Sequence, residues 1–419
     1  MNHRLIRFLK KILLINSIVF LLITTLSSTS KAQVNGEVIH DDNNFFVIRV
    51  WGSHQERGYA QGYLMGDKIT DIFRHHVQPL FGKYYPTAKE LSAKTTLFEI
   101  DSNYIIEAKS LIEGMNKAEL NNLGLDYQDI LLANTILDLQ NIMGNDNHTH
   151  CSSLMSWGDA TAGTDLDGKS VISRHLDWNL YQPLIRNQVM VIHIPSEQNE
   201  QPWAGIGFAG MISVLSGFNT NIGVFQHMME DENARASNER SYEPIWFSLR
   251  KSIEQTDPNA DGHNNVMDVK HVLNQRENGF GGNYIISALA RSTEKEDSLI
   301  AMVAELSAEE TFQVYRSNSY EKDAIPGDNL YTANQQIARN NKVNKKKRYK
   351  EVRSNLKKGT RISLEQNRHL MQYYSHLSIN YQFMTYCPEM DLFRISIRDY
   401  MPAYKTEPMD FKISVLFSR

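Results

Sequence analysis

Apolar positions recur with two different periods along this chain of 419 residues, and the change between them falls near residue 150. Between residues 68 and 140, apolar side chains recur every three to four positions, which is typical of amphipathic helices. Residues 38–48 precede that stretch with a strand-like pattern. After residue 151, short apolar runs are separated by turn signals, as strands are. The pattern therefore predicts a mainly helical segment followed by a strand-rich one.

The strand-rich part divides into two groups of strands, with helices between and after them. The first group is predicted at residues 152–157, 170–176, 189–194, 203–208, 212–215 and 223–228. Helices follow near residues 245–253 and 265–274, and the second group of strands is predicted at residues 283–289, 299–306 and 311–315. The chain ends with a helix over residues 364–374 and closing strands near residues 392–397 and 411–417. This order favours an α+β enzyme domain built in layers.

Three glycines, Gly58, Gly62 and Gly66, follow the first predicted strand at intervals of four residues. On a helix this spacing puts all three on one face, where two backbones can approach closely. A phosphate-binding loop would need a lysine followed by serine or threonine, which is absent here. We therefore interpret the three glycines as a helix-packing face.

The first 32 residues differ from the rest of the chain and match a secretory signal peptide. Basic residues come first, an apolar run over residues 12–26 follows, and Ser30 and Ala32 offer a small-x-small cleavage site. An uncleaved membrane anchor is the alternative, but the run is short for a span and is interrupted by polar residues such as Asn16. We expect an exported protein, periplasmic or extracellular.

The balance of charge disfavours several classes of partner. The chain carries a formal net charge of −4, and residues 1–32 hold five positive charges and no acidic residue, so the remainder would carry about −9. This balance does not favour nucleic acid or an anionic membrane surface as a partner. No later segment is apolar for long enough to span a bilayer, so we expect no stable membrane insertion after signal removal.

The chain has only two cysteines, Cys151 and Cys387, although an exported protein has access to disulfides. One bridge between them is therefore possible. Cys151 also follows His148 and His150, which could contribute to a metal site. Three ligands so close in sequence rarely share one tetrahedral site, and neither CxxC nor HExxH occurs. We predict no metal, and a metal hydrolase using the two histidines stays an alternative.

Cys151 opens a predicted hairpin that carries the groups needed for cysteine chemistry. A turn at Asp167-Gly168 precedes a strand that ends with Arg174 and Asp177, and the hairpin returns both charged residues towards the cysteine. A nearby guanidinium favours the reactive thiolate over the thiol. A carboxylate is useful if Cys151 has a free α-amino group, because the amine can then act as general base while the carboxylate orients it. These residues alone leave open a buried structural cysteine with a surface arginine.

The same block resembles the penicillin-acyltransferase-like cysteine hydrolases, peptidase family C45, within the wider group of choloylglycine hydrolases and acid ceramidase. The resemblance rests on Cys151-Ser152-Ser153, the Asp167-Gly168 turn and Arg174-His175-Leu176-Asp177-Trp178. Softer matches are spread over most of the chain after the signal peptide: Gly52 to Gly62, Gly217-Phe218-Asn219, Gly282-Asn283-Tyr284, and Tyr331-Thr332-Ala333-Asn334 with Arg348 after it.

Three departures from the family pattern concern its branch and substrate class more than its core chemistry. His150 stands where the acyltransferases often have glycine before the cysteine. His175 replaces the usual asparagine, and Ala333 and its neighbours replace a Thr-Asn-His sequence.

The resemblance implies a four-layer αββα sandwich of the N-terminal nucleophile type, preceded by a mainly helical segment. It implies that Cys151 is the nucleophile, that Asp177 holds its amino group, and that Arg174 stabilises the thiolate or contacts substrate. Asn283 would supply an amide N–H to the oxyanion, a contribution of about 10²–10³ in rate for a preorganised donor. No cofactor is implied.

The expected function is that of an exported cysteine amidohydrolase that cleaves a linear N-acyl amide of a small molecule through a thioester. Because a peptide nitrogen is not basic, the bond between His150 and Cys151 would have to be broken first, by the cysteine itself. After the signal peptide of residues 1–32, the chain would then consist of two associated parts, residues 33–150 and 151–419. The alternatives are an acyltransferase of the same family and a non-catalytic exported binding protein with a Cys151–Cys387 disulfide.

Overall fold

The computed structural model describes residues 34–42, 44–143, 150–228, 239–275, 279–293, 299–308, 313–319, 325–338, 347–357 and 359–419. The expected signal peptide of residues 1–32 lies outside these ranges, and so does His148. Asn35–Arg419 form one compact unit. Among the described residues, we find no helix with both the length and the apolar character needed to cross a membrane.

Helices dominate residues 54–143, as the apolar spacing predicts. The longest, α2 (His54–Ile72), begins at Ser53, whose hydroxyl accepts the backbone N–H of Glu56 while the Glu56 carboxylate accepts that of Ser53. This reciprocal cap satisfies donors that the first helical turn leaves unpaired. The other helical elements are η1 (Phe73–Val77), α3 (Gln78–Phe81), η2 (Gly82–Tyr84), α4 (Tyr85–Ser92), α5 (Ser102–Lys117), α6 (Tyr127–Asn134) and α7 (Ile136–Met143).

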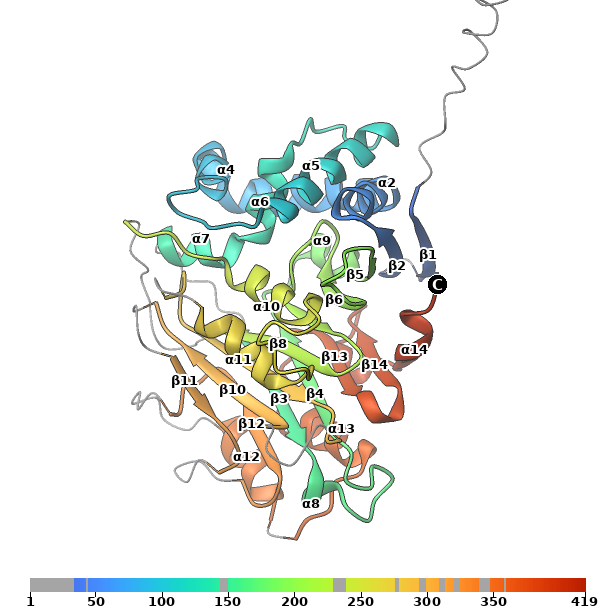
Figure 1. The fold of residues 1–419 in the computed structure, drawn as a ribbon, viewed down its shortest axis with the longest axis vertical. Helices are drawn as coiled ribbons and strands as arrows, with labels where there is room; N and C mark the ends of the chain where they lie inside the picture. Colours follow the sequence, from blue (N-terminus) through green and yellow to red (C-terminus); the bar gives the residue numbers. More distant parts are fainter. Residues whose placement is uncertain are drawn as a thin grey trace, which may run out of the picture. The chain divides into compact units, whose positions relative to one another are not determined.

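Helices α2 and α5 cross at their glycines, which confirms the interpretation of a packing face. A Cβ atom added at Gly62 would lie 1.8 Å from the carbonyl oxygen of Leu111, and one added at Gly114 would lie 2.0 Å from that of Tyr59. Only glycine allows two backbones to approach this closely. Figure 1 shows α2, α4, α5 and α6 gathered in the upper part of the view.

The larger sheet has nine strands in the order β1-β2-β5-β6-β7-β8-β9-β10-β11. Its first two strands come from the N-terminal segment, and β2 pairs in parallel with β5, whereas the other neighbours are antiparallel. The helical segment thus also contributes two strands to the strand-rich part. The strands are β1 (Gly36–Asp41), β2 (Phe45–Gly52), β5 (Gln188–Pro195), β6 (Trp203–Phe208), β7 (Ser216–Phe218), β8 (Ile222–Met228), β9 (Tyr284–Ala290), β10 (Ala301–Leu306) and β11 (Gln313–Arg316).

The smaller sheet has six antiparallel strands in the order β12-β3-β4-β13-β14-β15. The predicted hairpin after Cys151 forms two of its interior strands, β3 and β4. Strands from the C-terminal part of the chain flank that hairpin on both sides. The strands are β3 (His150–Ser156), β4 (Val171–Asp177), β12 (Asn329–Thr332), β13 (Asn380–Cys387), β14 (Leu392–Ile397) and β15 (Met409–Lys412).

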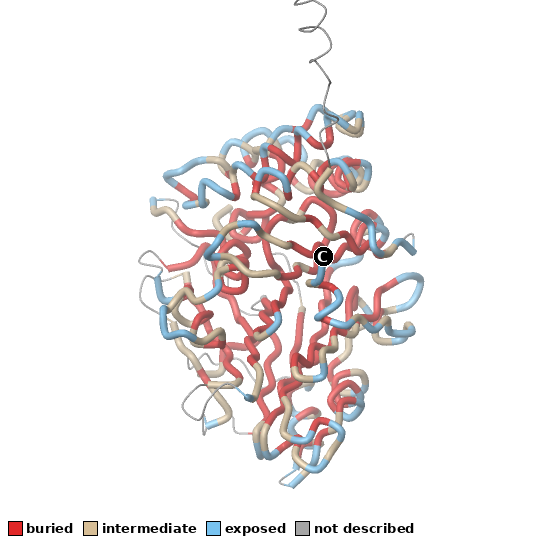
Figure 2. The backbone as a smooth tube through the Cα atoms, turned by 45° about the vertical axis from the view of Figure 1, so that its right-hand side comes forward, coloured by how far each residue is buried: buried red, intermediate tan, exposed pale blue. Residues whose placement is uncertain are grey.

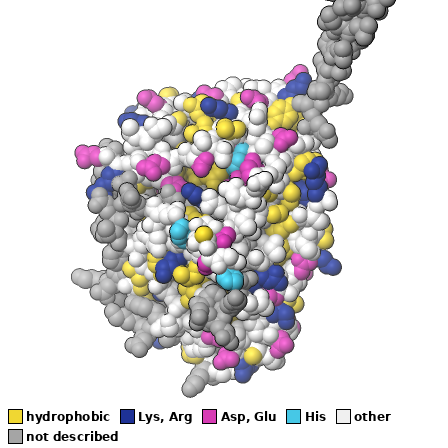
Figure 3. Space-filling model, in the orientation of Figure 1, with side chains coloured by type: hydrophobic (Ala, Val, Ile, Leu, Met, Phe, Trp, Pro, Cys, Tyr) yellow, Lys and Arg dark blue, Asp and Glu magenta, His cyan; other side chains and the backbone are white. Residues whose placement is uncertain are grey.

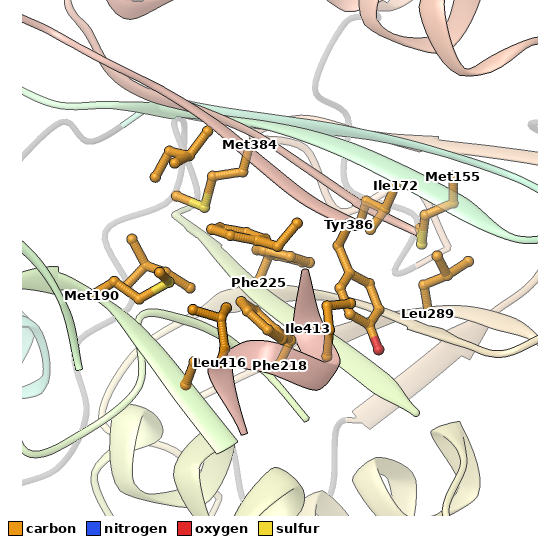
Figure 4. Packing of buried hydrophobic residues seen from close by; sticks show 14 of the residues in the cluster. Met155, Ile172, Met190, Phe218, Phe225, Leu289, Met384, Tyr386, Ile413 and Leu416 are labelled. Atoms are coloured by element: carbon orange, nitrogen blue, oxygen red, sulfur yellow. The ribbon is translucent and has the colours of Figure 1, made fainter. Parts of the chain in front are cut away.

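The two sheets pack face to face over a buried apolar core (Figure 4). Met155, Ile172 and Met384 of the smaller sheet meet Phe218 and Phe225 of the larger one. Figure 2 shows buried segments through the interior, with exposed segments at the rim. Short helical elements join or follow the strands: α8 (Gly158–Thr161), α9 (Gln182–Ile185), η4 (Pro388–Met390), η5 (Ala403–Lys405) and α14 (Ile413–Leu416).

Helices cover the outer face of each sheet. Helices α10 (Ile245–Glu254) and α11 (Val266–Asn274) lie on the larger sheet, and α12 (Lys347–Asn355) and α13 (Leu364–Tyr374) lie on the smaller one. The layers therefore run helix, sheet, sheet, helix, and the expected α+β fold of the αββα type is confirmed. Figure 3 shows acidic and basic side chains interspersed on the face turned to the viewer.

Two predicted strands are wrong, each because side chains redirect the backbone hydrogen bonds. Residues 212–215 form no strand, since the backbone N–H groups of Ile212 and Ser213 donate to Oδ1 of Asn134. The predicted strand over residues 411–417 ends at Lys412 and continues as α14. There Asp391 accepts from the backbone and hydroxyl of Ser414, which favours a helical turn.

Candidate active site

Strand β3 presents Cys151 towards the space between the two sheets. In the antiparallel register of β3 and β4, Cys151 is paired with Leu176. Ser153, two residues farther along β3, is paired with Arg174. Successive side chains of a strand point to opposite faces. Because Met155 lies in the core between the sheets, Cys151 and Ser153 face the same way. The local hairpin thus brings Arg174 alongside the cysteine, as its sequence predicts.

Arg174 reaches the thiol directly. Its Nη2 lies 3.5 Å from Sγ of Cys151 and donates to the backbone oxygen of Gln226 on β8 at 3.0 Å. Both side chains are buried. Burial raises the pKa of the Cys151 thiol above its usual value, the Arg174 charge opposes that rise, and the nearby Asp177 charge adds to it. The thiol is therefore protonated at neutral pH.

The backbone nitrogen of Cys151 has its own set of polar neighbours. Its N–H donates to Oδ1 of Asn334 at 3.2 Å, and the same oxygen accepts from Nη2 of Arg348 at 2.7 Å. Arg348 Nη1 lies 3.6 Å from Oδ2 of Asp177. The other carboxylate oxygen of Asp177, Oδ1, accepts from Nδ2 of Asn380 at 2.9 Å. These four side chains form a connected network, which we call the Asn334 network, around the bond between His150 and Cys151.

Asp177 is fully buried at the end of β4, opposite His150. Burial raises the pKa of its carboxyl to about 7, although Arg348, the hydrogen bond from Asn380 and Arg174 all favour the ionised form. A new ammonium group on Cys151 would add a further positive charge nearby, and an opposite charge favours a carboxylate. The geometry is thus compatible with the role expected for Asp177.

Asn283 lies just before β9 and is almost fully buried. Its Oδ1 accepts the backbone N–H of Ala308 at 3.0 Å, so this oxygen is engaged by the chain that leaves β10. The contacts described above around Cys151 come from other residues. The oxyanion role expected for Asn283 stays a prediction.

Sequence reasoning gave no role to two residues of the Asn334 network and missed a third. Asn334 and Arg348 belong to a short motif match, but nothing in their spacing indicated a contact with the nitrogen of Cys151. Asn380 was not singled out, since 203 residues separate it from Asp177 and only the pairing of β13 with β4 brings the two together. No local sequence pattern carries that information.

The expected alternative of a Cys151–Cys387 disulfide is wrong. Both cysteines are free and buried. In the register of the smaller sheet, Gln382 lies level with Cys151 through Leu176, so Cys387 is five residues farther along β13. That offset corresponds to about 16 Å along a strand, well beyond the reach of a disulfide. Burial raises the pKa of Cys387 to about 12, as for an inert core thiol.

A cavity of about 640 Å³ lies beside the His150 end of β3. Asn334 and Arg348 form part of its wall together with His150, so it adjoins the Asn334 network. Ligand pockets for small molecules span about 300–1,000 Å³, and this cavity falls within that range. Its wall combines polar with aromatic side chains: Gln335, Lys347, Glu351, His376, Tyr349, Tyr373 and Tyr374.

A second polar cluster lies at the junction of the N-terminal helices with α10 and the chain after β5. His54 contacts Oε2 of Glu107 and Oε1 of Glu200, both at 2.8 Å, through its two ring nitrogens. We call this the His54 cluster: His54, Arg57, Glu107, Glu197, Glu200, Arg250 and Glu254.

The His54 cluster has the donor atoms for a metal, but these atoms are already engaged by other groups of the protein. Ligand atoms of His54, Glu197 and Glu200 lie within 4.8 Å of one another. Arg57 already donates to both glutamates, and the backbone N–H of His54 donates to the other oxygen of Glu197. Arg250 adds a second guanidinium. Cations therefore already occupy the places a metal would take, and we interpret the cluster as a buried ion network.

Comparison with known proteins gives partial matches. No protein-family model matches the chain. Protein dcd1B of Dictyostelium discoideum is 21% identical over 230 residues, which is 51% of this chain and 43% of that protein. The N-acylethanolamine-hydrolyzing acid amidase ortholog of Caenorhabditis elegans covers 57% of this chain and 93% of its own, at 14% identity and a TM-score of 0.40. A mutant conjugated bile acid hydrolase from Clostridium perfringens covers 64% and 94%, at 12% identity and a TM-score of 0.39.

With sequence identities of 12–21% and TM-scores of 0.39 and 0.40, this chain is only partly similar to these proteins. The matched part of protein dcd1B is less than half of that protein's length. The αββα architecture of this chain rests on its own strand order and layers.

Proposed function

We propose that the protein is an exported cysteine amidohydrolase of the N-terminal nucleophile type, which hydrolyses a linear N-acyl amide. One observation carries the proposal. Cys151 stands at the start of a central strand, with its thiol beside Arg174 and its backbone nitrogen bonded to Asn334. If the bond before Cys151 is broken, this nitrogen becomes a free amine, and Asn334 is already placed to hold it.

The first step is cleavage of the chain before Cys151. The Cys151 thiol adds to the carbonyl carbon of His150, the peptide C–N bond breaks, and the nitrogen takes up a proton to become an amine. The resulting thioester between His150 and Cys151 is then hydrolysed by water, which returns the thiol and leaves a carboxylate on His150. Cys151 becomes the first residue of a new chain.

In the mature enzyme the α-amine of Cys151 is the general base. It takes the thiol proton as sulfur attacks the substrate carbonyl, and it returns the proton to the leaving amine when the C–N bond breaks. Water then hydrolyses the acyl thioester. Asp177 and Asn334 hold the amine, and Arg174 stabilises negative charge at sulfur or on the substrate.

Arg174 has two N–H donors available to bind a negatively charged oxygen of the substrate. Within the described part of the chain, its Nε and Nη1 are buried and make no hydrogen bond. Leaving a buried donor unpaired costs about 1–3 kcal/mol, so a group that pairs with it on binding gains that energy. A carbonyl oxygen that becomes negative during the reaction is such a group.

The cavity of about 640 Å³ is lined by His150, Asn334 and Arg348 but not by Cys151 or Arg174. It adjoins the reactive end of β3, and its volume is that of a small-molecule pocket, but it does not identify the acyl group or the amine. Hydrolysis is favoured over acyl transfer because an exported enzyme has free access to water and no evident supply of activated acyl donors.

Denaturing mass spectrometry of the purified protein, joined to an activity screen, tests the proposal. We expect two chains, residues 33–150 and 151–419, and hydrolysis of at least one member of a panel of N-acyl amino acids, bile-salt conjugates and penicillins. Cys151→Ala should remain one chain and be inactive. A single uncut chain with full activity contradicts the mechanism, and a two-chain protein that hydrolyses no amide contradicts the activity.

A further inference from the structure

A buried ion pair at the far edge of the larger sheet contacts the segment that carries Asn334. Glu305 on β10 and Arg316 on β11 are both buried, and Arg316 Nε lies 2.9 Å from Oε1 of Glu305. We propose that this pair, together with Gln336, positions Asn334 against the nitrogen of Cys151. The inference rests on the proposed function, because it assigns positioning residues for that reaction.

Asn334 needs such support because of where it stands in the chain. It follows β12 in residues 333–338, a stretch without regular secondary structure. Strand hydrogen bonds hold a strand residue in place, whereas a side chain on an irregular segment is only as well placed as the groups that hold the segment. The question is therefore what holds residues 333–338.

Glu305 holds the end of this segment. Its Oε1 accepts the backbone N–H of Ile337 at 2.8 Å, and its Oε2 accepts that of Ala338 at 2.9 Å. Both carboxylate oxygens are thus engaged with consecutive backbone groups, three and four residues beyond Asn334. Hydrogen bonds to a charged acceptor are stronger than those between neutral groups, which suits an anchor.

Arg316 and Gln336 complete the support on either side of Asn334. Arg316 Nη2 donates to the backbone oxygen of Tyr331 at 3.1 Å. Gln336 is fully buried, and its Nε2 donates to the backbone oxygens of Tyr284 at 3.0 Å and of Leu306 at 2.6 Å. These donors and acceptors connect the Asn334 segment to β9 and β10.

This arrangement joins the two sheets at the reactive end. Strand β12 belongs to the smaller sheet, as does Cys151, whereas Glu305 and Arg316 belong to the larger sheet. The pair contacts the chain before Asn334, at Tyr331 of β12, and after it, at Ile337 and Ala338. A shift of the pair would therefore shift the hydrogen-bond acceptor for the Cys151 nitrogen.

Glu305→Gln is the first test. A glutamine has one acceptor oxygen, so it cannot accept from Arg316 and Ile337 through one oxygen and from Ala338 through another. We expect kcat on an N-acyl amide to fall by about 10- to 100-fold, as for residues that orient a functional group without touching the substrate. KM should change less than about twofold. An acceptor bonded to an ammonium favours its charged form, so loss of the Asn334 contact should also move the acid limb of the kcat/KM profile to lower pH.

Glu107→Gln is the matched control. Glu107 is also fully buried and pairs with an arginine, Arg250, but it belongs to the His54 cluster. We expect this variant to lose stability and to keep the wild-type kcat, KM and pH profile. Gln336→Met, which removes two donors at similar size, is the second test in case Glu305→Gln does not fold, and should show the same fall in kcat and the same pH shift.

Several outcomes would overturn the inference. One is folded Glu305→Gln or Gln336→Met protein with wild-type kcat and an unmoved acid limb. Another is an equal loss in Glu107→Gln, because a general loss of stability would then explain the effect. A wild-type protein that neither cleaves before Cys151 nor hydrolyses amides refutes the proposed function, and this inference with it.

Discussion

The backbone nitrogen of Cys151 lies 3.2 Å from Oδ1 of Asn334, although 183 residues separate the two in sequence. In the uncut chain this contact is an ordinary peptide N–H donating to a side-chain oxygen. If the chain is cleaved before Cys151 as we propose, the same contact would hold one hydrogen of the new amine and so fix the direction of the nitrogen lone pair. The same geometry would then serve the chain before and after cleavage.

Asn334→Ala should impair catalysis far more than stability. The change removes the acceptor for Cys151 and also releases Arg348, which donates to the same oxygen. A misplacement of about 1 Å at a reacting group can cost about 10²-fold in rate, and we expect kcat to fall by at least that factor. Steady-state kinetics and thermal unfolding, measured on one preparation, check the prediction.

Asn367→Ala is the control for that experiment. Asn367 is equally buried and donates to Oγ of Ser156 at 3.2 Å, at the opposite end of β3 from Cys151. Its loss should lower the melting temperature and leave kcat unchanged. If the two alanine variants have similar kcat values, Asn334 has no special relation to the reaction.

Arg174→Met should make the Cys151 thiol less reactive. The Arg174 charge lowers the pKa of that thiol, and an opposite charge at this range is worth about 1–3 pKa units. We therefore expect alkylation of Cys151 at pH 7 to slow about tenfold or more. Mass spectrometry of alkylated peptides follows Cys151 and distinguishes it from Cys387, whose raised pKa keeps it unreactive.

Arg368→Met controls for the loss of a buried arginine that packs against the same sheet, from helix α13. Arg368 donates to Thr385 and lies over the ring of Phe383, on the outer face of the sheet. This variant should alkylate at the wild-type rate. An unchanged rate in Arg174→Met would remove Arg174 from the reactive site.

The sequence predicts what is local in this site and misses what is distant. Cys151, Arg174 and Asp177 lie on one hairpin, so turn signals and the strand period suffice to bring them together. Asn334 follows β12 and Asn380 begins β13, the strands that flank the hairpin. Periodicity indicates that these strands exist but does not say which strands they pair with, so their contacts could not be predicted.

The fold shows the same limit. Apolar spacing predicts the helices before residue 143 and most later strands, because each pattern reflects one buried face. It does not predict that β1 and β2 join the nine-stranded sheet through a parallel pair of β2 with β5. It also fails at residues 212–215, where Asn134, a residue distant in sequence, takes the backbone hydrogen bonds.

Gly62→Ala should destabilise the protein strongly. The added Cβ would lie 1.8 Å from the backbone oxygen of Leu111, so helices α2 and α5 would have to separate. Overpacking costs about 1–3 kcal/mol and occasionally more, and we expect the upper end because the clash is with backbone. In Gly66→Ala the added Cβ would lie 2.8 Å from Cβ of Leu120, a much smaller overlap than the one at Gly62. Chemical denaturation should show a clearly larger loss for Gly62→Ala than for Gly66→Ala.

The His54 cluster predicts a loss of stability at alkaline pH. Burial lowers the pKa of His54, but hydrogen bonds with Glu107 and Glu200 outweigh burial and the Arg250 charge, and the pKa rises from 6.5 to about 9. The folded state then binds more protons than the unfolded state between these values, so stability falls as pH rises through that window. The contribution is complete below pH 6.5 and gone above about pH 9, and it amounts to roughly 3 kcal/mol.

A comparison of three proteins isolates this contribution. In His54→Gln the residue no longer titrates, so the difference in unfolding free energy from wild type should shrink steadily between pH 6.5 and 10. His76→Gln is the control, since burial lowers the pKa of His76 to about 4 and that side chain stays neutral throughout the window. Its difference from wild type should be constant. If the His54→Gln difference is also constant with pH, His54 is neutral in the folded protein. The four carboxylates of the cluster would then face two cations, Arg57 and Arg250, instead of three, and a bound cation would become the better interpretation of the cluster.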